Sequence, residues 1–172
     1  MPNKHTYIHA LITNHHVINE NTIKKGIPFK IEFNNNKENR IIKINKDRKV
    51  YTNSEYNITI IEIKENDGIC NFLELDENIN NSYILVKSKI YFLFYLGNES
   101  NGRFSFGMVK EIKGYQILHD CSSGMGSSGG PILSLNTNKV IGIHLGSMID
   151  KSINFGSLLN QAVSEFLSNY FK

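Results

Sequence analysis

Short stretches of β-branched and aromatic residues run through the chain, and clusters of Asn, Gly and Asp separate them. Branched and aromatic side chains suit a pleated sheet, whereas Asn, Gly and Asp suit tight turns. The pattern predicts strands at residues 7–13, 28–33, 40–44, 58–63, 83–86, 90–96, 104–112, 116–119, 132–135, 140–144 and 153–155. Because eleven short strands are too many for one small sheet, the predicted fold class is all-β, a barrel or a sandwich.

The end of the chain follows a different period. Between residues 158 and 171 the apolar side chains recur at helical spacing, and Ser157 precedes them as a candidate N-cap. We therefore expect one C-terminal helix. Residues 76–82 have no apolar period and are interpreted as a connection between two halves, and the polar residues 34–39 as the tip of a surface hairpin.

Length and charge narrow the function classes. With 172 residues, the chain suits one compact domain or two small halves that share a core. The net charge is only +3 and the lysines are scattered, whereas phosphate binding needs concentrated positive charge. Nucleic acid is therefore not expected as a partner.

The remaining composition bears on location and redox state. No apolar run is long enough to span a bilayer, so no membrane partner is expected, and residues 1–6 lack the pattern of a signal peptide. The prediction is an intracellular protein, or a secreted one if an N-terminal segment is missing from this chain. Cys70 and Cys121 fit no metal motif and are expected to be reduced, with a single disulfide as the alternative.

The sharpest local signal is the hexapeptide at residues 126–131, Gly-Ser-Ser-Gly-Gly-Pro, which an apolar strand follows. Ser128 is its candidate nucleophile. Glycines permit a tight turn there and let the backbone N–H groups of Gly126 and Ser128 point at one developing oxyanion. Taken alone, the hexapeptide is equally well an ordinary flexible loop.

Two other site types share part of this motif. A phosphate-binding P-loop is excluded because no Lys and Ser/Thr pair follows the glycines. The nucleophile elbow of α/β-hydrolases matches Gly-x-Ser-x-Gly, but an elbow leads into a helix and precedes its histidine. Here the residues after Ser128 predict a strand, and the candidate histidine lies upstream.

That histidine belongs to the segment Thr13-Asn14-His15-His16-Val17, at the end of a predicted strand. This segment, followed later by Gly-x-Ser-Gly-Gly-Pro, resembles the trypsin-like serine peptidases of the V8 and HtrA kind. The resemblance extends from about Ala10 to the C-terminal helix. It implies that His16 is the catalytic base and Ser128 the nucleophile, with no metal or organic cofactor.

The resemblance also implies a fold of two antiparallel β-barrels with the active site between them. Residues 1–80 would form the half that carries His16 and Asn57, and residues 81–172 the half that carries Ser128, the specificity pocket and the final helix. Only fifteen residues precede His16, where the family usually has a further strand. An incomplete first barrel is therefore expected.

Asn57 departs from the family pattern because it stands where the triad aspartate is expected, at the head of a strand. That aspartate fixes the histidine tautomer and stabilises the imidazolium, and an amide carries no charge for the second task. Neither neighbouring carboxylate is expected to replace it, since Glu55 is predicted to face solvent and Glu62 to lie on the opposite face of the strand.

A specificity pocket is suggested by a second likeness. Ser123, His144 and Gly146 resemble the residues with which glutamyl endopeptidases bind an acidic side chain, and an imidazole with a hydroxyl suits a carboxylate. The alternative is that His144 is an ordinary core histidine bonded to backbone.

Three functions are consistent with these residues. The first is a serine endopeptidase acting through an acyl-enzyme, weakened by Asn57, with a preference for an acidic residue before the scissile bond (P1). The second is an inactive pseudopeptidase that binds a peptide or protein. The third, an esterase of the α/β-hydrolase class, requires a helix directly after Ser128.

Overall fold

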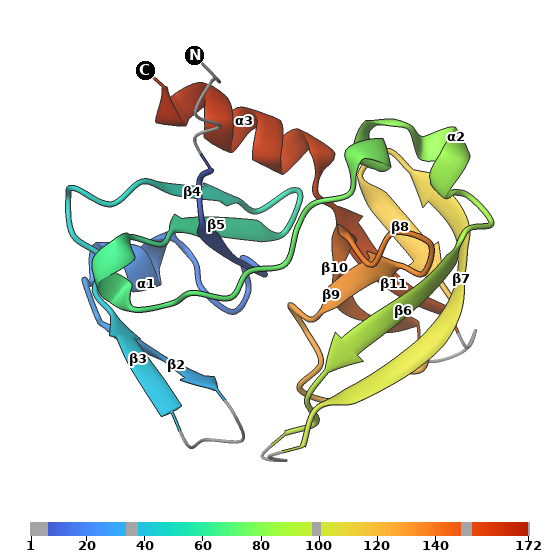
Figure 1. Ribbon diagram of the computed structural model, residues 1–172, viewed down its shortest axis with the longest axis horizontal. Coiled ribbons are helices and arrows are strands. Elements are labelled where there is room, and N and C mark those ends of the chain that lie inside the picture. Colours follow the sequence, from blue (N-terminus) through green and yellow to red (C-terminus); the bar gives the residue numbers. More distant parts are fainter. Residues whose placement is uncertain (1–6, 34–37, 98–100, 149–152, 172) are drawn as a thin grey trace.

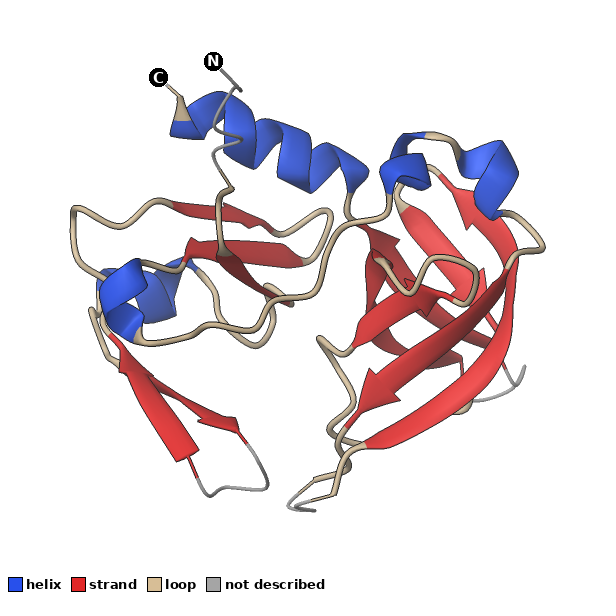
Figure 2. Cartoon of the chain, in the orientation of Figure 1, coloured by secondary structure: helices blue, strands red, loops and turns tan. Residues whose placement is uncertain are grey.

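The computed structural model describes residues 7–33, 38–97, 101–148 and 153–171. This part of the chain is mostly β (Figures 1 and 2). Its strands are β1 (Ala10–Thr13), β2 (Phe29–Phe33), β3 (Glu38–Ile42), β4 (Val50–Asn53), β5 (Ile58–Glu62), β6 (Lys89–Phe94), β7 (Arg103–Lys113), β8 (Gln116–His119), β9 (Pro131–Ser134), β10 (Val140–Met148) and β11 (Ile153–Leu158). Its helices are α1 (Glu20–Lys24), α2 (Ser82–Leu85) and α3 (Asn160–Tyr170), with 3-10 turns η1 (Glu65–Asp67) and η2 (Glu77–Asn80).

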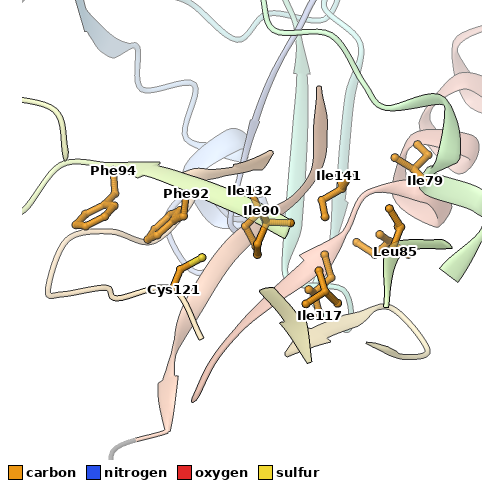
Figure 3. Packing of buried hydrophobic residues seen from close by; sticks show 11 residues of the cluster. Ile79, Leu85, Ile90, Phe92, Phe94, Ile117, Cys121, Ile132 and Ile141 are labelled. Carbon is orange, nitrogen blue, oxygen red and sulfur yellow. The ribbon is translucent and has the colours of Figure 1, made fainter. Parts of the chain in front are cut away.

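The C-terminal half closes into a barrel of antiparallel strands in the order β10-β11-β8-β7-β6-β9. Side chains alternate along β6, where Ile90, Phe92 and Phe94 point inward while the residues between them are more exposed. Figure 3 shows these three with Ile117 and Ile132 filling the interior. Closure pairs every strand of this half on both sides, so β9 is held rigidly beside β6 and β10.

The N-terminal half is more open. Within the described residues it contains a three-stranded sheet, β1-β5-β4, and a separate β2-β3 hairpin that extends away from it in Figure 1. The prediction of two barrels therefore holds in full only for the C-terminal half, and the first barrel is incomplete, as expected from the sequence. The division at residue 80 stays a prediction, as does the hairpin tip, most of which lies outside the described residues.

A shared core joins the two halves. It combines Ile58 and Ile60 from β5, Leu133 and Ile143 from β9 and β10, and Phe166 from α3. Helix α3 follows the closed barrel in sequence but covers the N-terminal sheet (Figure 1). Burying one apolar surface between elements from both halves fixes their relative position.

Polar contacts reinforce this junction. The hydroxyls of Tyr51 and Tyr56 donate to the carboxylate of Glu165 on α3, at 2.8 and 3.3 Å. Ser157 Oγ donates to the backbone carbonyl of Tyr56. The chain just before Asn57 is therefore attached to two elements of the C-terminal half.

Several elements differ from the sequence expectations, and the short helix α1 is one that was not predicted. Residues 83–86 were predicted as a strand but belong largely to α2, because in this segment only Leu85 reaches the core, while Tyr83 and Ile84 face solvent. Strand β4 was not predicted, since four residues with one inward apolar side chain give little signal. Helix α3 begins at Asn160, not at 158, because β11 continues to Leu158 and Ser157 serves as a strand residue and not as a cap.

Two further observations concern the cysteines and the helices. Cys70 is exposed, Cys121 is buried and both thiols are free, as predicted. No helix in the described ranges is long and apolar enough to cross a membrane.

Candidate active site

The turn after β1 brings His16 to the surface. Its backbone is closed by bonds from the N–H groups of Val17 and Ile18 to the carbonyl of Asn14, at 3.0 and 3.1 Å. The His15 N–H donates to the carbonyl of Asn57 at 3.1 Å, and the buried side chain of Asn14 donates to the same carbonyl at 3.4 Å. The histidine turn and the turn before β5 are thus a single hydrogen-bonded unit.

The two adjacent histidines have different partners. His15 Nε2 lies 2.7 Å from Glu20, and Thr52 also donates to that carboxylate. These hydrogen bonds, that from His15 foremost, lower the pKa of Glu20 to about 2. His16 instead turns its ring toward Asn57, which is the partner expected of the catalytic base.

Asn57 has a left-handed backbone, with φ of 52°, a conformation that Asn tolerates better than most residues. Its Oδ1 accepts from the backbone N–H of His16 at 3.0 Å. The ring nitrogen Nδ1 of His16 lies 3.0 Å from Asn57 Nδ2 and 3.2 Å from Oδ1. Oδ1 has a second lone pair, but Nδ2 is the nearer of the two atoms to Nδ1, so we interpret the amide NH₂, which can only donate, as the group that bonds Nδ1.

The neighbouring carboxylates do not reach His16. Glu55 is exposed, and Glu62 accepts from the backbone N–H of Lys49 and from the hydroxyl of Tyr170. Glu20 is held by His15 and Thr52. Among the described residues no carboxylate is hydrogen-bonded to His16, so Asn57 is the group that orients it.

Ser128 lies in a tight loop that leads directly into β9. Gly126 and Gly129 have positive φ of 94° and 83°, where a side chain would be strained. A Cβ on Gly130 would collide with the Leu93 carbonyl and the Phe92 ring. The glycines are therefore required by the backbone path, and the strand after Ser128 excludes the α/β-hydrolase elbow.

The backbone donors of this loop divide into two sets. Ser127 N–H donates to Gly124 O at 3.2 Å, and Gly129 N–H to His144 O at 2.9 Å. Within the described ranges, the N–H groups of Gly126 and Ser128 have no protein acceptor. These are the two donors predicted for the oxyanion.

The histidine and serine motifs meet across the two halves. A Cβ placed on Gly129 would lie 3.2 Å from Thr13 Oγ1 and 3.8 Å from Asn14 Oδ1, so the loop after Ser128 touches the strand that leads to His16. Ser128 Oγ itself donates to the Leu145 carbonyl at 3.2 Å. No hydrogen bond joins Ser128 to His16 in the described part of the chain.

The predicted pocket residues lie on the β10 side of Ser128. His144 is 1% exposed and is pressed against Phe92, with ring centroids 4.6 Å apart. Ser123 donates to Asn154 at 2.5 Å, and Gly146 pairs with Phe155 on β11.

A second buried histidine, His119, lies next to His144. His144 Nδ1 lies 3.4 Å from Nε2 of His119, which is fully buried on β8. Burial lowers the pKa of both imidazoles to about 4, so both are neutral at pH 7. His144 therefore has an imidazole partner and not the backbone partner of an ordinary core histidine.

Comparison with known proteins identifies the family. Residues 4–143 match the family model described as the trypsin-like peptidase domain. The chain belongs to the trypsin-like peptidase family. No curated protein matches it. A solved structure of a Glu endopeptidase in complex with MPD covers 94% of this chain and 80% of its own, with a TM-score of 0.68 and 18% identity. At that identity the likeness shows the chymotrypsin-like fold.

Within this trypsin-like domain, sequence reasoning missed His119 and Leu145. His119 ends a short strand in which inward and outward residues alternate, and only the pairing of β8 with β11 brings it close to β10. Leu145 contributes through its carbonyl, a group that every residue has, so no side-chain signal could have marked it.

Proposed function

We propose that this trypsin-like domain is a serine endopeptidase that hydrolyses peptide bonds through an acyl-enzyme, at a rate limited by Asn57. The observation that carries the proposal is the loop at residues 126–130, which presents Ser128 and two unengaged N–H donors directly beside the strand that leads to His16. Family membership makes peptides or proteins the substrates.

In the proposed reaction, Ser128 first leaves the Leu145 carbonyl and turns toward His16. His16 Nε2 takes the hydroxyl proton as Oγ attacks the scissile carbonyl, and later returns that proton to the leaving amine. The N–H groups of Gly126 and Ser128 hold the oxygen that becomes negative. The freed Leu145 carbonyl can then accept a hydrogen bond from the substrate backbone.

Asn57 slows this sequence at the first proton transfer. Its amide donates toward Nδ1, which leaves the imidazole proton on Nε2, the nitrogen that must accept the proton of Ser128. The imidazolium that follows also lacks a negative neighbour. In another trypsin-class enzyme the same exchange of aspartate for asparagine lowers kcat about 10⁴-fold.

We further propose that an acidic residue precedes the scissile bond. The residues assigned to this preference are Ser123, which donates to Asn154 on β11, and His144 and Gly146 on β10. If the neutral His144 accepts a hydrogen bond from His119 at Nδ1, its other ring nitrogen can donate one to a carboxylate. The likeness in fold to a Glu endopeptidase is in keeping with this preference.

A pseudopeptidase that binds peptides without cleaving them is the second candidate. Two observations favour it: Asn57 is placed to hold the wrong tautomer of His16, and Ser128 bonds to Leu145 and not to His16. Such a protein would keep the cleft and the pocket but show no nucleophilic serine.

Hydrolysis of matched fluorogenic peptides tests the proposal. We expect slow cleavage after Glu and at least tenfold slower cleavage after Lys or Ala, since only the carboxylate finds donors in the pocket. Ser128→Ala should abolish cleavage, while Ser122→Ala, an exposed neighbour, should retain it. Activity that survives Ser128→Ala would refute the mechanism, and equal rates for all three peptides would refute the acidic preference.

A further inference from the structure

A cavity of about 580 Å³ lies beside Ser128, and none of the predicted acidic-pocket residues Ser123, His144 and Gly146 lines it. One wall is the loop 126–130 with Pro131, and the other is formed where β6 ends and β7 begins, by Leu93, Phe94, Tyr95 and Phe104 among others. Ser128 and the oxyanion donor Gly126 are part of the lining, so this cavity is continuous with the reacting centre.

The topology of the barrel decides which part of a substrate would reach it. Strand β9 starts three residues after Ser128 and has β10 on one side and β6 on the other (Figure 1). The acyl half of a peptide bound at Ser123 and His144 occupies the β10 side. The leaving half must continue over the β6 side, and so into the cavity.

The wall is largely apolar and aromatic, with the charged Arg103 beside Phe104. Phe104 is 65% exposed and Tyr95 53% exposed, although both are large side chains that lose favourable free energy when they face water. Exposed aromatic groups gathered beside a cleft are typical of a binding surface. Both rings line the cavity, so a large apolar side chain bound there would find aromatic surface to pack against.

The wall is also preformed. The Tyr95 ring lies over Gly102, where an added Cβ would be 3.4 Å from the ring, and the Phe104 ring packs edge-on against Phe106 at 5.5 Å between centroids. The Gly97 N–H donates to Met125 O at 3.1 Å and holds the end of β6 against the serine loop. A ligand would therefore find the surface largely in place.

We propose that this cavity is a leaving-side subsite that binds a large apolar or aromatic residue of the peptide, directly after the scissile bond. The inference rests on the proposed function only in that a peptide lies across Ser128 with its acyl half on β10. It names a preference that the acidic pocket does not supply.

The test measures binding without catalysis. In the full chain carrying Ser128→Ala, the affinities of fluorescein-labelled Ala-Ala-Glu-Phe-Ala-amide and Ala-Ala-Glu-Ala-Ala-amide are compared by fluorescence anisotropy. We expect the Phe peptide to bind about tenfold more tightly, as burial of one aromatic side chain in a half-open pocket allows. Adding Phe104→Ala should reduce the ratio to about twofold or less, while the matched change Phe171→Ala, at the exposed end of α3, should leave it unchanged.

Each outcome decides the proposal. Equal affinities for the two peptides, including no measurable binding of either, would overturn the subsite, as would a Phe preference that persists in Phe104→Ala. Because the protein used is inactive, failure of catalysis cannot produce a negative result here. If the Ser128→Ala protein prefers the Phe peptide but Ser128 of the wild-type protein proves unreactive, the peptidase proposal is rejected and the subsite proposal stands.

Discussion

The activity expected of the protein depends mainly on one hydrogen bond, that between Asn57 and the ring of His16. Oδ1 of Asn57 accepts from the backbone N–H of His16, and Nδ2 faces the ring nitrogen Nδ1 at 3.0 Å. A carboxylate in the same place would accept from both groups. The exchange of one oxygen for an NH₂ group thus reverses the direction of the bond to the ring without disturbing the bond to the backbone.

The tautomer of His16 follows from this geometry. We expect the neutral imidazole of the wild-type protein to carry its proton on Nε2, because Asn57 Nδ2 donates to Nδ1. Asn57→Asp should move the proton to Nδ1, and ¹⁵N chemical shifts of the ring nitrogens measure both states. Ser128→Ala is the control, since it should leave the wild-type tautomer in place. A wild-type ring protonated on Nδ1 would contradict this interpretation.

The buried pair of His119 and His144 predicts a pH dependence of stability. Burial lowers the pKa of both side chains to about 4, whereas an unfolded histidine titrates near 6.5. The neutral forms therefore favour the folded state fully above about pH 6.5, and this contribution is lost as the pH falls toward 4, where the unfolded chain binds the extra protons.

Urea unfolding at pH 7 and pH 4.5 measures that loss. We expect the free energy of unfolding to fall by about 3 kcal/mol or more over this range, since two histidines take up protons on unfolding. His119→Gln removes one of the titrating groups and should reduce the difference by about half. His9→Gln, which replaces a histidine stacked on Phe72 outside the buried pair, is the control. Identical slopes for His119→Gln and wild type would refute the assignment.

At the scale of elements, α3 acts as the support for the turn that carries Asn57. Glu165 accepts hydrogen bonds from Tyr51 on β4 and from Tyr56, the residue before Asn57. Burial of Tyr51 and its bond to Glu165 raise the pKa of its phenol, so the hydroxyl stays a donor at any physiological pH. The C-terminal helix therefore holds a loop that lies more than a hundred residues earlier in the sequence.

Glu165→Ala should loosen that support. We expect a loss of about 1–2 kcal/mol in the free energy of unfolding, because two phenol hydroxyls lose their acceptor. Asn169→Ala, on the exposed side of the same helix, should change stability by less than about 0.5 kcal/mol. Chemical denaturation of both variants beside wild type measures the difference. Equal stability of Glu165→Ala and Asn169→Ala would show that the Glu165 carboxylate does not stabilise the fold through Tyr51 and Tyr56.

Several elements could be predicted from the sequence because their signal is local. The alternating residues of β6 and the Gly-rich loop before β9 carry their own pattern, and both were found where expected. Strand β4 and helix α2 were missed or mistaken because their conformation depends on contacts with distant segments. Tyr51, for example, is buried only because α3 folds back over the N-terminal sheet.

At the scale of the whole molecule, the trypsin-like frame was recognisable from the two motifs around His16 and Ser128, but their relation was not. Sequence order could predict that the motifs meet, and Gly129 does lie against Thr13. The bond from Ser128 to Leu145, the histidine behind His144 and the cavity beside β6 all arise from barrel closure. Such contacts join residues far apart in the chain and leave no local pattern.

In the proposed mechanism, the closed barrel and the open N-terminal sheet each carry some of the catalytic groups. The barrel carries Ser128, the N–H groups proposed to hold the oxyanion and the predicted pocket residues, in a frame paired on both edges of every strand. The N-terminal sheet contributes His16 and Asn57, and α3 with the shared core sets its position. On this proposal, Asn57 in the less complete half is the group that limits the rate.

Active-site titration of the wild-type protein beside Asn57→Asp tests this account most directly. A peptidyl diphenyl phosphonate with Glu at its reactive end reports the fraction of nucleophilic Ser128 and the rate at which it reacts. We predict that Asn57→Asp is labelled to about one equivalent per chain, at a rate up to about 10⁴ times that of wild type, and that Asn57→Asp combined with Ser128→Ala is not labelled. If Asn57→Asp stays unlabelled, His16 and Ser128 do not form a catalytic pair and the domain is a binding module. If wild type reacts as fast as Asn57→Asp, Asn57 is not the limiting group.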